Sequence, residues 1–161
     1  MLQVAGFLEH STVNGEGLRS VLFVSGCTHH CPKCHNVSMQ NPGYGKSCSV
    51  LEIYHRILKN KPIIDGVTFS GGEPFEQHLE LIELAQLLKA EDLTIWCYSG
   101  YTYEKLKQDP SKKHLLNLID VLVDGPFIYS LADDNLKYRG SSNQHIYALK
   151  DGDIVDCLDF S

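Results

Sequence analysis

The sequence predicts an α/β fold, an open and incomplete (β/α) barrel with a mostly parallel sheet and a C-terminal hairpin. Short apolar runs typical of strands alternate with segments of helical periodicity, which favours βαβ units and a parallel sheet. A complete eight-unit barrel needs about 200 residues or more. The chain has 161 residues, and we count about four βα units before its last hairpin, so we expect the barrel to stay open.

The predicted strands are short apolar runs bounded by turn residues. Residues 1–19 are predicted to be irregular, because Gly6, Asn14-Gly15 and Gly17 are turn signals. Asp151-Gly152 separates the last two apolar runs, which predicts a tight hairpin. The expected strands are residues 20–25, 66–69, 93–98, 119–123, 146–149 and 154–158.

The predicted helices lie between these strands. Ser49 and Glu52 form a capping-box pattern, which begins a helix that extends to about Lys59. Residues 70–74 interrupt the second strand, and a helix of about 15 residues follows them. A short helix is expected from near Thr102. The apolar stripe of the second helix consists of Leu81, Leu84, Ala85 and Leu88.

Composition and charge limit the kinds of protein that this chain can be. The net charge of −6 argues against a nucleic-acid-binding face, which needs clustered Lys and Arg. The sequence contains no run of about 18 apolar residues, the length that would predict a membrane span. The N-terminus lacks the pattern of a signal peptide. We therefore expect a single domain over residues 1–161 in the cytoplasm, where its six cysteines stay reduced.

Each of the four strands expected to be parallel ends in a polar or glycine-rich loop. These loops begin with Cys27, Ser70, Ser99 and Asp124. Because parallel strands place their carboxyl ends on one rim of a sheet, the four loops are expected to converge. That rim is where we expect a functional site.

The loop after the first strand contains three closely spaced cysteines, Cys27, Cys31 and Cys34. Thiolates this close suit a soft metal or an iron–sulfur cluster, and three ligands on a four-iron cluster leave one iron open. A structural zinc site with a fourth protein ligand is the alternative, and the spacing alone does not exclude it. The candidate fourth ligands are His29, His30, His35 and Cys48, although His29 and His30 are expected to face the solvent.

The loop after the second strand contains adjacent glycines. Gly71 and Gly72 would let a ligand lie against bare backbone, and Glu73 could pair with an ammonium group. The simpler alternative is a tight strand-to-helix turn that binds nothing.

These two loops together resemble the radical S-adenosylmethionine (SAM) superfamily. Its Cys-x3-Cys-x2-Cys motif matches Cys27, Cys31 and Cys34, and its Gly-Gly-Glu motif matches residues 71–73. The resemblance implies a [4Fe–4S] cluster held by the three cysteines, with an open iron that chelates the amino and carboxylate groups of SAM. It also implies cofactor contacts from Lys33, Cys34, His35, Gly71, Gly72 and Glu73.

Two consequences of this resemblance concern single residues. His35 departs from the Tyr or Trp that the superfamily commonly has, so stacking on adenine and a surface position are both open for it. Gly72 is expected to face the methionine part of SAM, so a side chain there is expected to weaken SAM binding and leave iron binding intact.

A narrower resemblance, to the activating proteins of anaerobic ribonucleoside-triphosphate reductases, covers nearly the whole chain. The segment Asn14-Gly15-Glu16-Gly17 differs from the family's pattern at Glu16, where Pro is common, and Tyr98-Ser99-Gly100-Tyr101 resembles its Thr-Gly-Tyr loop. The other matching motifs are Phe23-Val24-Ser25-Gly26-Cys27, Leu122-Val123-Asp124-Gly125-Pro126-Phe127 and Arg139-Gly140-Ser141-Ser142-Asn143-Gln144.

This resemblance implies an enzyme that cleaves SAM reductively and generates a glycyl radical on the large subunit of the class III reductase. No catalytic residue beyond the cluster and SAM is then required. A reduced flavodoxin-like protein is the implied electron donor, which the sequence does not identify. Residues 98–101 and 139–144 are expected to form the docking rim for the large subunit.

Several alternatives remain open from the sequence. The chain could be a small radical SAM enzyme that acts on a free small molecule, a zinc-stabilised binding module or an electron-transfer iron–sulfur protein. Asp124 could contact SAM or cap the Gly125-Pro126 turn, and Arg139 could bind cofactor, partner or a surface carboxylate. Cys48, Cys97 and Cys157 fit no ligand spacing.

Overall fold

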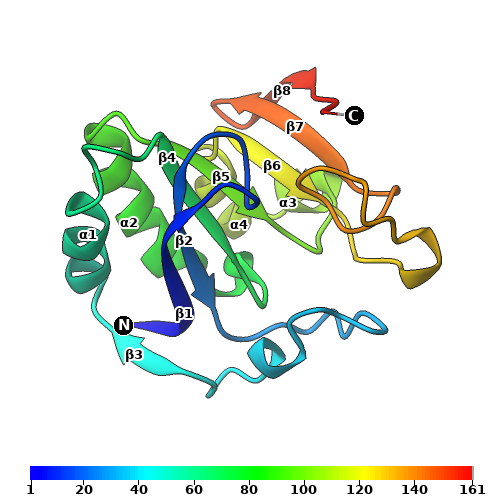
Figure 1. Cartoon of the computed structure of the whole chain (residues 1–161), viewed down its shortest axis with the longest axis horizontal. Helices are drawn as coiled ribbons and strands as arrows, with labels where there is room; N and C mark the ends of the chain where they lie inside the picture. The colour runs from blue at the N-terminus through cyan, green and yellow to red at the C-terminus, as the bar shows by residue number, and fades with distance from the viewer. Residues whose placement is uncertain (161) are drawn as a thin grey trace.

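The structure, a computed structural model, describes residues 1–160 and contains one open sheet with helices on one face (Figure 1). Within that range the sheet has eight strands in the order β3-β1-β2-β4-β5-β6-β7-β8. None of the helices within residues 1–160 has the length and hydrophobicity of a membrane-spanning segment. The strands are β1 Leu2–Ser11, β2 Arg19–Val24, β3 Lys46–Cys48, β4 Gly66–Gly71, β5 Thr94–Tyr98, β6 Val121–Asp124, β7 His145–Lys150 and β8 Asp153–Cys157. The helices are α1 Val50–Leu58, α2 His78–Ala90, α3 Tyr103–Gln108 and α4 Pro110–Leu116, with 3₁₀ turns at Val37–Gln40, Pro74–Gln77 and Tyr129–Leu131.

The centre of the sheet is parallel, as the alternation of strands and helices predicted. Strands β2, β4, β5 and β6 pair in parallel, and antiparallel strands extend the sheet on both sides. β3 and β8 lie at opposite edges, so the sheet does not close. The C-terminal hairpin of β7 and β8 turns at Asp151 and Gly152, both with positive φ. The expected α/β class, open sheet and terminal hairpin are confirmed; the parallel strands form only the core of the sheet, because four of the seven pairings among the described strands are antiparallel.

The prediction for residues 1–19 was wrong in its first half, because residues 2–11 form β1. Gly6 was read as a turn signal, but it lies inside this strand at an irregularity of the pairing with β2. Only Gly15 and Gly17 have the positive φ of a true turn. The three-residue strand β3 and the helix α4 were not predicted, since both are too short for a periodic pattern.

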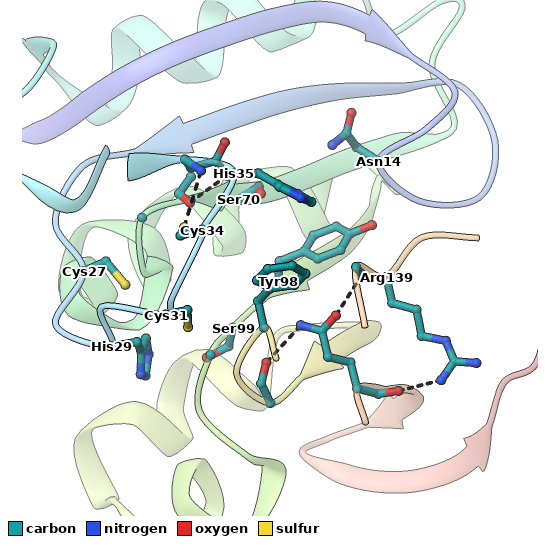
Figure 2. Close-up of a pocket in the computed structure, with 18 of the residues that line it drawn as sticks. Asn14, Cys27, His29, Cys31, Cys34, His35, Ser70, Tyr98, Ser99 and Arg139 are labelled. Atoms are coloured by element: carbon teal, nitrogen blue, oxygen red, sulfur yellow. Dashed lines mark hydrogen bonds between the residues drawn. The ribbon is translucent and has the colours of Figure 1, made fainter. Parts of the chain in front are cut away.

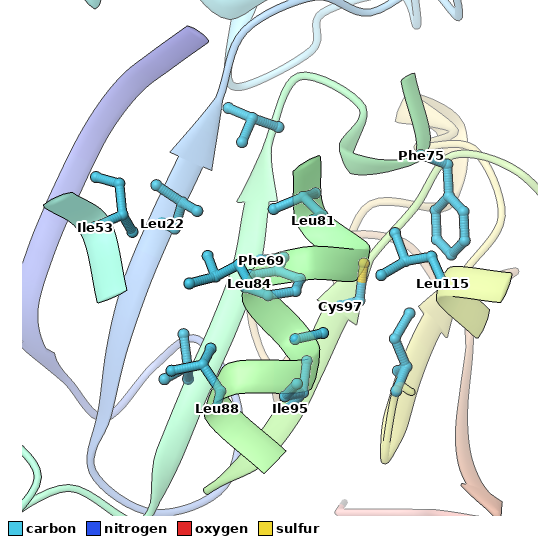
Figure 3. Packing of buried hydrophobic residues seen from close by; sticks show 14 of the residues in the cluster. Leu22, Ile53, Phe69, Phe75, Leu81, Leu84, Leu88, Ile95, Cys97 and Leu115 are labelled. Atoms are coloured by element: carbon cyan, nitrogen blue, oxygen red, sulfur yellow. The ribbon is translucent and has the colours of Figure 1, made fainter. Parts of the chain in front are cut away.

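The helices begin where their capping residues indicated. Ser49 accepts a hydrogen bond from the Glu52 backbone N–H at 3.1 Å, and the Glu52 carboxylate accepts one from the Ser49 N–H at 3.4 Å. Thr102 caps α3. The predicted stripe of α2 is fully buried against the sheet and is part of the main core (Figure 3).

The two faces of the sheet differ in chemistry. Leu22, Phe69 and Cys97 are register partners across β2, β4 and β5, and they face the helices. Alternation along a strand therefore turns Val21, Thr68 and Trp96 to the other face. That second face carries polar and aromatic side chains, and loop 12–18 folds over it (Figure 1).

Arg19 holds loop 12–18 against this second face. Its guanidinium is buried and donates to Thr68 Oγ1 (2.9 Å), to the carbonyl oxygens of Val67 (2.9 Å) and Thr94 (2.8 Å), and to that of Glu16 (3.1 Å). Burial lowers the pKa of Arg19 to about 10, so the group stays charged at neutral pH. One side chain thereby joins the beginnings of β2, β4 and β5 to the loop.

We expect Arg19→Lys to lower the free energy of unfolding by about 2 kcal/mol, because a compact ammonium cannot reach all four buried acceptors. Urea-induced unfolding of the oxygen-free protein measures this change. Arg56→Lys is the matched control, since Arg56 forms an exposed ion pair with Glu9. Equal effects of the two substitutions would show that the buried hydrogen bonds of the Arg19 guanidinium do not stabilise the fold.

Candidate functional site

A cavity of about 430 Å³ lies at the carboxyl ends of the parallel strands (Figure 2). Its wall includes the cysteine loop after β2 (residues 25–45), the glycine turn at the end of β4 (Gly71-Gly72), residues 98–100 at the end of β5 and the segment after β6. The expected convergence of these four loops is therefore confirmed. Val13 and Asn14 of loop 12–18 complete the wall from the second face of the sheet.

The cysteine loop brings Cys27, Cys31 and Cys34 to the cavity wall as free, partly exposed thiols. His30 and Lys33 adopt positive φ between them (51° and 55°). The backbone N–H of Asn36 donates to Cys34 Sγ at 3.4 Å. Three thiols on one wall fit the donor set of an iron–sulfur cluster, in which each cysteine binds a different iron.

Protonation of these thiols depends on what occupies the cavity. Burial raises the pKa of the Cys27 thiol, and the nearby carboxylate of Glu73 raises it further. The free thiol is thus protonated at neutral pH, and iron binding must displace that proton. No group of three His, Cys, Asp or Glu side chains within residues 1–160 surrounds a single point where one metal ion would bind.

The four candidate zinc ligands are each engaged elsewhere. His29 Nε2 lies 2.7 Å from Glu73 Oε1, and His30 Nδ1 lies 3.3 Å from Gln40 Oε1. The His35 ring is 4.9 Å from that of Phe127, and Cys48 is buried in the main core. The expectation of a solvent-facing His29 was wrong, because its side chain is only 16% exposed.

The glycine turn is pressed against the cysteine loop. Gly71 has a φ of +113°, and a Cβ there would lie 2.5 Å from the Val24 nitrogen. A Cβ on Gly72 would lie 2.5 Å from the Gly26 carbonyl oxygen and 2.6 Å from that of Met39. Gly72 and Glu73 donate backbone hydrogen bonds to Val24 and Gly26, at 2.8 and 2.7 Å. Both glycines are thus required for two backbones to touch.

Glu73 is fully buried and ties three loops together. Its carboxylate accepts from the Phe75 N–H (3.0 Å), the Gly100 N–H (2.7 Å) and the Ser99 hydroxyl (2.9 Å), and it contacts His29. The cavity wall contains Gly71 and Gly72, whereas Glu73 is behind it. Pairing of Glu73 with the ammonium of SAM stays a prediction. The contacts observed here show that the carboxylate also positions the three loops relative to one another.

The family model described as "4Fe-4S single cluster domain" matches residues 13–147. An anaerobic ribonucleoside-triphosphate reductase-activating protein of Vibrio cholerae is 40% identical over 84% of this chain and 90% of its own length. Those of Escherichia coli K12 (36% identical; 86% and 93% covered) and phage T4 (35%; 87% and 90%) are also similar.

The chain belongs to the family of anaerobic ribonucleoside-triphosphate reductase-activating proteins. The matched range includes the cysteine loop, the glycine turn and the polar segment after β6. The loops that form the cavity wall after the parallel strands therefore all lie within the matched range.

Within this family member, Lys33 and His35 point in different directions. His35 is part of the cavity wall. The Lys33 ammonium instead lies 3.9 Å from the ring centre of Tyr129. Contact of either residue with SAM stays a prediction. Of the two, His35 lines the cavity proposed below to bind SAM.

The roles left open by the sequence are clearer for Asp124 and Arg139. The buried Asp124 carboxylate accepts from the backbone N–H groups of Tyr103 (2.8 Å) and His145 (3.1 Å), so it joins α3 and β7 to β6. Arg139 borders the cavity, and its guanidinium donates to the Gln144 carbonyl oxygen at 2.7 Å. Cys97 is buried with a raised pKa, and Cys157 is exposed on β8.

Several cavity residues were not recognised from the sequence. Asn14 reaches the wall because Thr68 Oγ1 donates to its carbonyl oxygen at 2.6 Å. Phe127, Leu136 and Tyr138 come from an irregular segment without periodicity. The only local signal was Phe127 following the Asp-Gly-Pro turn; nothing local indicated Tyr138, which packs on Trp96.

We expect Glu73→Gln to lower the free energy of unfolding by about 2 kcal/mol. The NH₂ group of the new amide would face the N–H of either Phe75 or Gly100, so one of these buried donors would lose its acceptor. Urea-induced unfolding without oxygen gives the value. Glu83→Gln on the exposed face of α2 is the control and should leave the midpoint in place. A wild-type midpoint for Glu73→Gln would contradict the network described above.

The expected effect of a side chain at Gly72 needs correction. Its Cβ would meet the backbone of the cysteine loop, so we now expect Gly72→Ala to lower iron content as well as SAM binding. Iron per chain after oxygen-free reconstitution tests this. Gly43→Ala is the matched control in the same region, because its Cβ would meet only Asn41 Oδ1 at 3.4 Å. Full iron retention by Gly72→Ala would mean that the two loops can separate without cost.

Proposed function

We propose that the chain activates an anaerobic (class III) ribonucleoside-triphosphate reductase by generating a glycyl radical on the large subunit. The reaction uses reductive cleavage of SAM at a [4Fe–4S] cluster. The observation that carries this proposal is the set of three free cysteines on a cavity at the carboxyl ends of parallel strands. It comes from a chain that matches both the iron–sulfur domain model and the activating proteins over most of its length.

Cys27, Cys31 and Cys34 are the proposed cluster ligands, which leaves one iron for SAM. The Asn36 N–H that donates to Cys34 Sγ would remain as a hydrogen bond to a ligand sulfur, a contact that raises cluster potential. The Glu73–His29 contact would hold the loop between the first two ligands in place. Residues 1–161 are proposed to form a single radical SAM domain.

The proposed SAM site is the cavity beside the cysteines. Gly71 and Gly72 offer backbone at the wall, which suits the methionine end, and His35 with Phe127 offers rings for the adenine. When bound, the reduced cluster would supply the one electron that cleaves SAM into methionine and a 5′-deoxyadenosyl radical. That radical would take a hydrogen atom from the glycine Cα. The chain's own part is to orient SAM and to exclude water with its aromatic wall.

Two partners follow from this proposal. The large subunit of the reductase supplies the glycine, and a reduced, flavodoxin-like protein supplies the electron. The six free thiols suit a reducing compartment, for which we propose the cytoplasm. Neither nucleic acid nor membrane takes part in the proposed reaction.

The test combines oxygen-free protein, iron, sulfide, SAM, a reductant and the reductase large subunit. We expect a glycyl radical by electron paramagnetic resonance, with one 5′-deoxyadenosine formed for each radical. Deuterium placed at the glycine Cα should appear in the 5′-deoxyadenosine. Coupled turnover of a free small molecule, without label transfer from the large subunit, would overturn the proposal.

Replacing Cys27, Cys31 or Cys34 by Ala should abolish both the cluster absorbance and the radical, because each removes one thiolate ligand. Iron content per chain is the readout that does not depend on activity. Cys157→Ala is the control, since that thiol is exposed on β8 and remote in sequence from the cysteine loop. A variant of the three that keeps full iron would remove its cysteine from the ligand set.

A further inference from the structure

The segment after β6 exposes apolar side chains beside the cavity. Ile128, Tyr129 and Leu131 are 38%, 54% and 42% exposed, and we call these three residues the apolar rim. Neither hydrophobic cluster of the described residues includes them. Phe127, which directly precedes the rim, and Leu136 of the same segment form part of the cavity wall, so the rim lies on a segment that contributes to that wall.

The segment that carries the apolar rim is held in a defined shape. The Ile128 N–H donates to Ser141 Oγ at 3.2 Å, and the Ser142 N–H donates to the Leu131 carbonyl oxygen at 2.9 Å. Gln144 Nε2 donates to the Gly125 carbonyl oxygen at 3.0 Å. The backbone is therefore ordered before any partner arrives, which lowers the entropy lost on binding.

The apolar rim also touches the cysteine loop. The Lys33 ammonium lies 3.9 Å from the ring centre of Tyr129, a cation–π contact that joins two segments far apart in sequence. Figure 1 shows the segment after β6 projecting from the sheet on the same side as the cysteine loop. Both segments contribute to the cavity wall, and the rim lies on one of them in contact with the other.

The residues expected to dock the partner are less available than the rim. Ser99 is buried against Glu73. The Gln144 side chain is bonded to Gly125, and Arg139 is bonded to the Gln144 carbonyl oxygen. The polar groups of these residues are therefore bonded within the protein, whereas the apolar side chains of the rim are exposed to solvent. Contiguous exposed apolar residues beside a site are typical of protein-binding surfaces.

We infer that Ile128, Tyr129 and Leu131 bind the glycine-bearing segment of the reductase large subunit through apolar side chains that flank the glycine. This inference rests on the proposed function, which requires a protein segment to bring its Cα–H into the cavity. Docking on the rim covers the open side of the sheet and keeps water from the reaction. Tyr129 is the central contact, because a large amphipathic ring already fixed by Lys33 loses little entropy.

The experiment compares wild type with the double variant Ile128→Asp/Leu131→Asp, each loaded with its cluster. Equilibrium binding to the large subunit without oxygen is expected to weaken at least tenfold, since two charges would be desolvated in an apolar contact. SAM binding, measured separately, is expected to change less than twofold. Ile63→Asp is the control, because Ile63 is 56% exposed and precedes β4 at the opposite end of the sheet.

Three outcomes overturn the inference while leaving the proposed function intact. In the first, the double variant binds the large subunit as tightly as wild type. In the second, Ile63→Asp loses as much affinity, which indicates a general charge effect. In the third, sedimentation shows a wild-type dimer that the double variant lacks, with large-subunit affinity unchanged, which assigns the rim to self-association. Failure of wild type to form any glycyl radical is the separate result that contradicts the proposed function.

Discussion

The structure depends above all on the backbone contact between the cysteine loop and the glycine turn. Parallel pairing of β2 with β4 places both strand ends at one rim, and two residues without a Cβ let the backbones touch there. Glu73 then extends the contact to the loop after β5 through its buried carboxylate. The Gly-Gly-Glu sequence thus serves first to position three loops, and the cavity is the space that they leave between them.

The second face of the sheet explains why so short a chain can build such a cavity. Helices cover only the first face, so the other is free for loop 12–18 and the segment after β6. Arg19 fixes the first of these, and hydrogen bonds of the side chains of Ser141 and Gln144 fix the second. An open sheet therefore has walls on most sides of its cavity without a complete barrel.

Sequence patterns predicted the elements that local chemistry determines. The parallel strands, the Ser49 cap, the stripe of α2 and the meeting of the four loops all follow from periodicity and turn residues. Strand β1 was missed because Gly6 was given its usual meaning as a turn, and Tyr138 because long-range packing on Trp96 decides its place. The buried contacts of Glu73 were also beyond local patterns, since its partners His29, Ser99 and Gly100 all lie more than 20 residues away in sequence. The sequence motifs indicated which residues belong to the candidate site, but the contacts of each residue could be described only from the folded structure.

The central claim is that three cysteines of this cavity hold a four-iron cluster with one iron open to SAM. Mössbauer spectroscopy of protein reconstituted with ⁵⁷Fe tests this most directly, because it distinguishes an iron site with a unique ligand from the others. The account predicts one iron site whose isomer shift and quadrupole splitting change when SAM is added, while the remaining sites do not. A spectrum that SAM leaves unchanged, or one typical of a two-iron cluster, would contradict it.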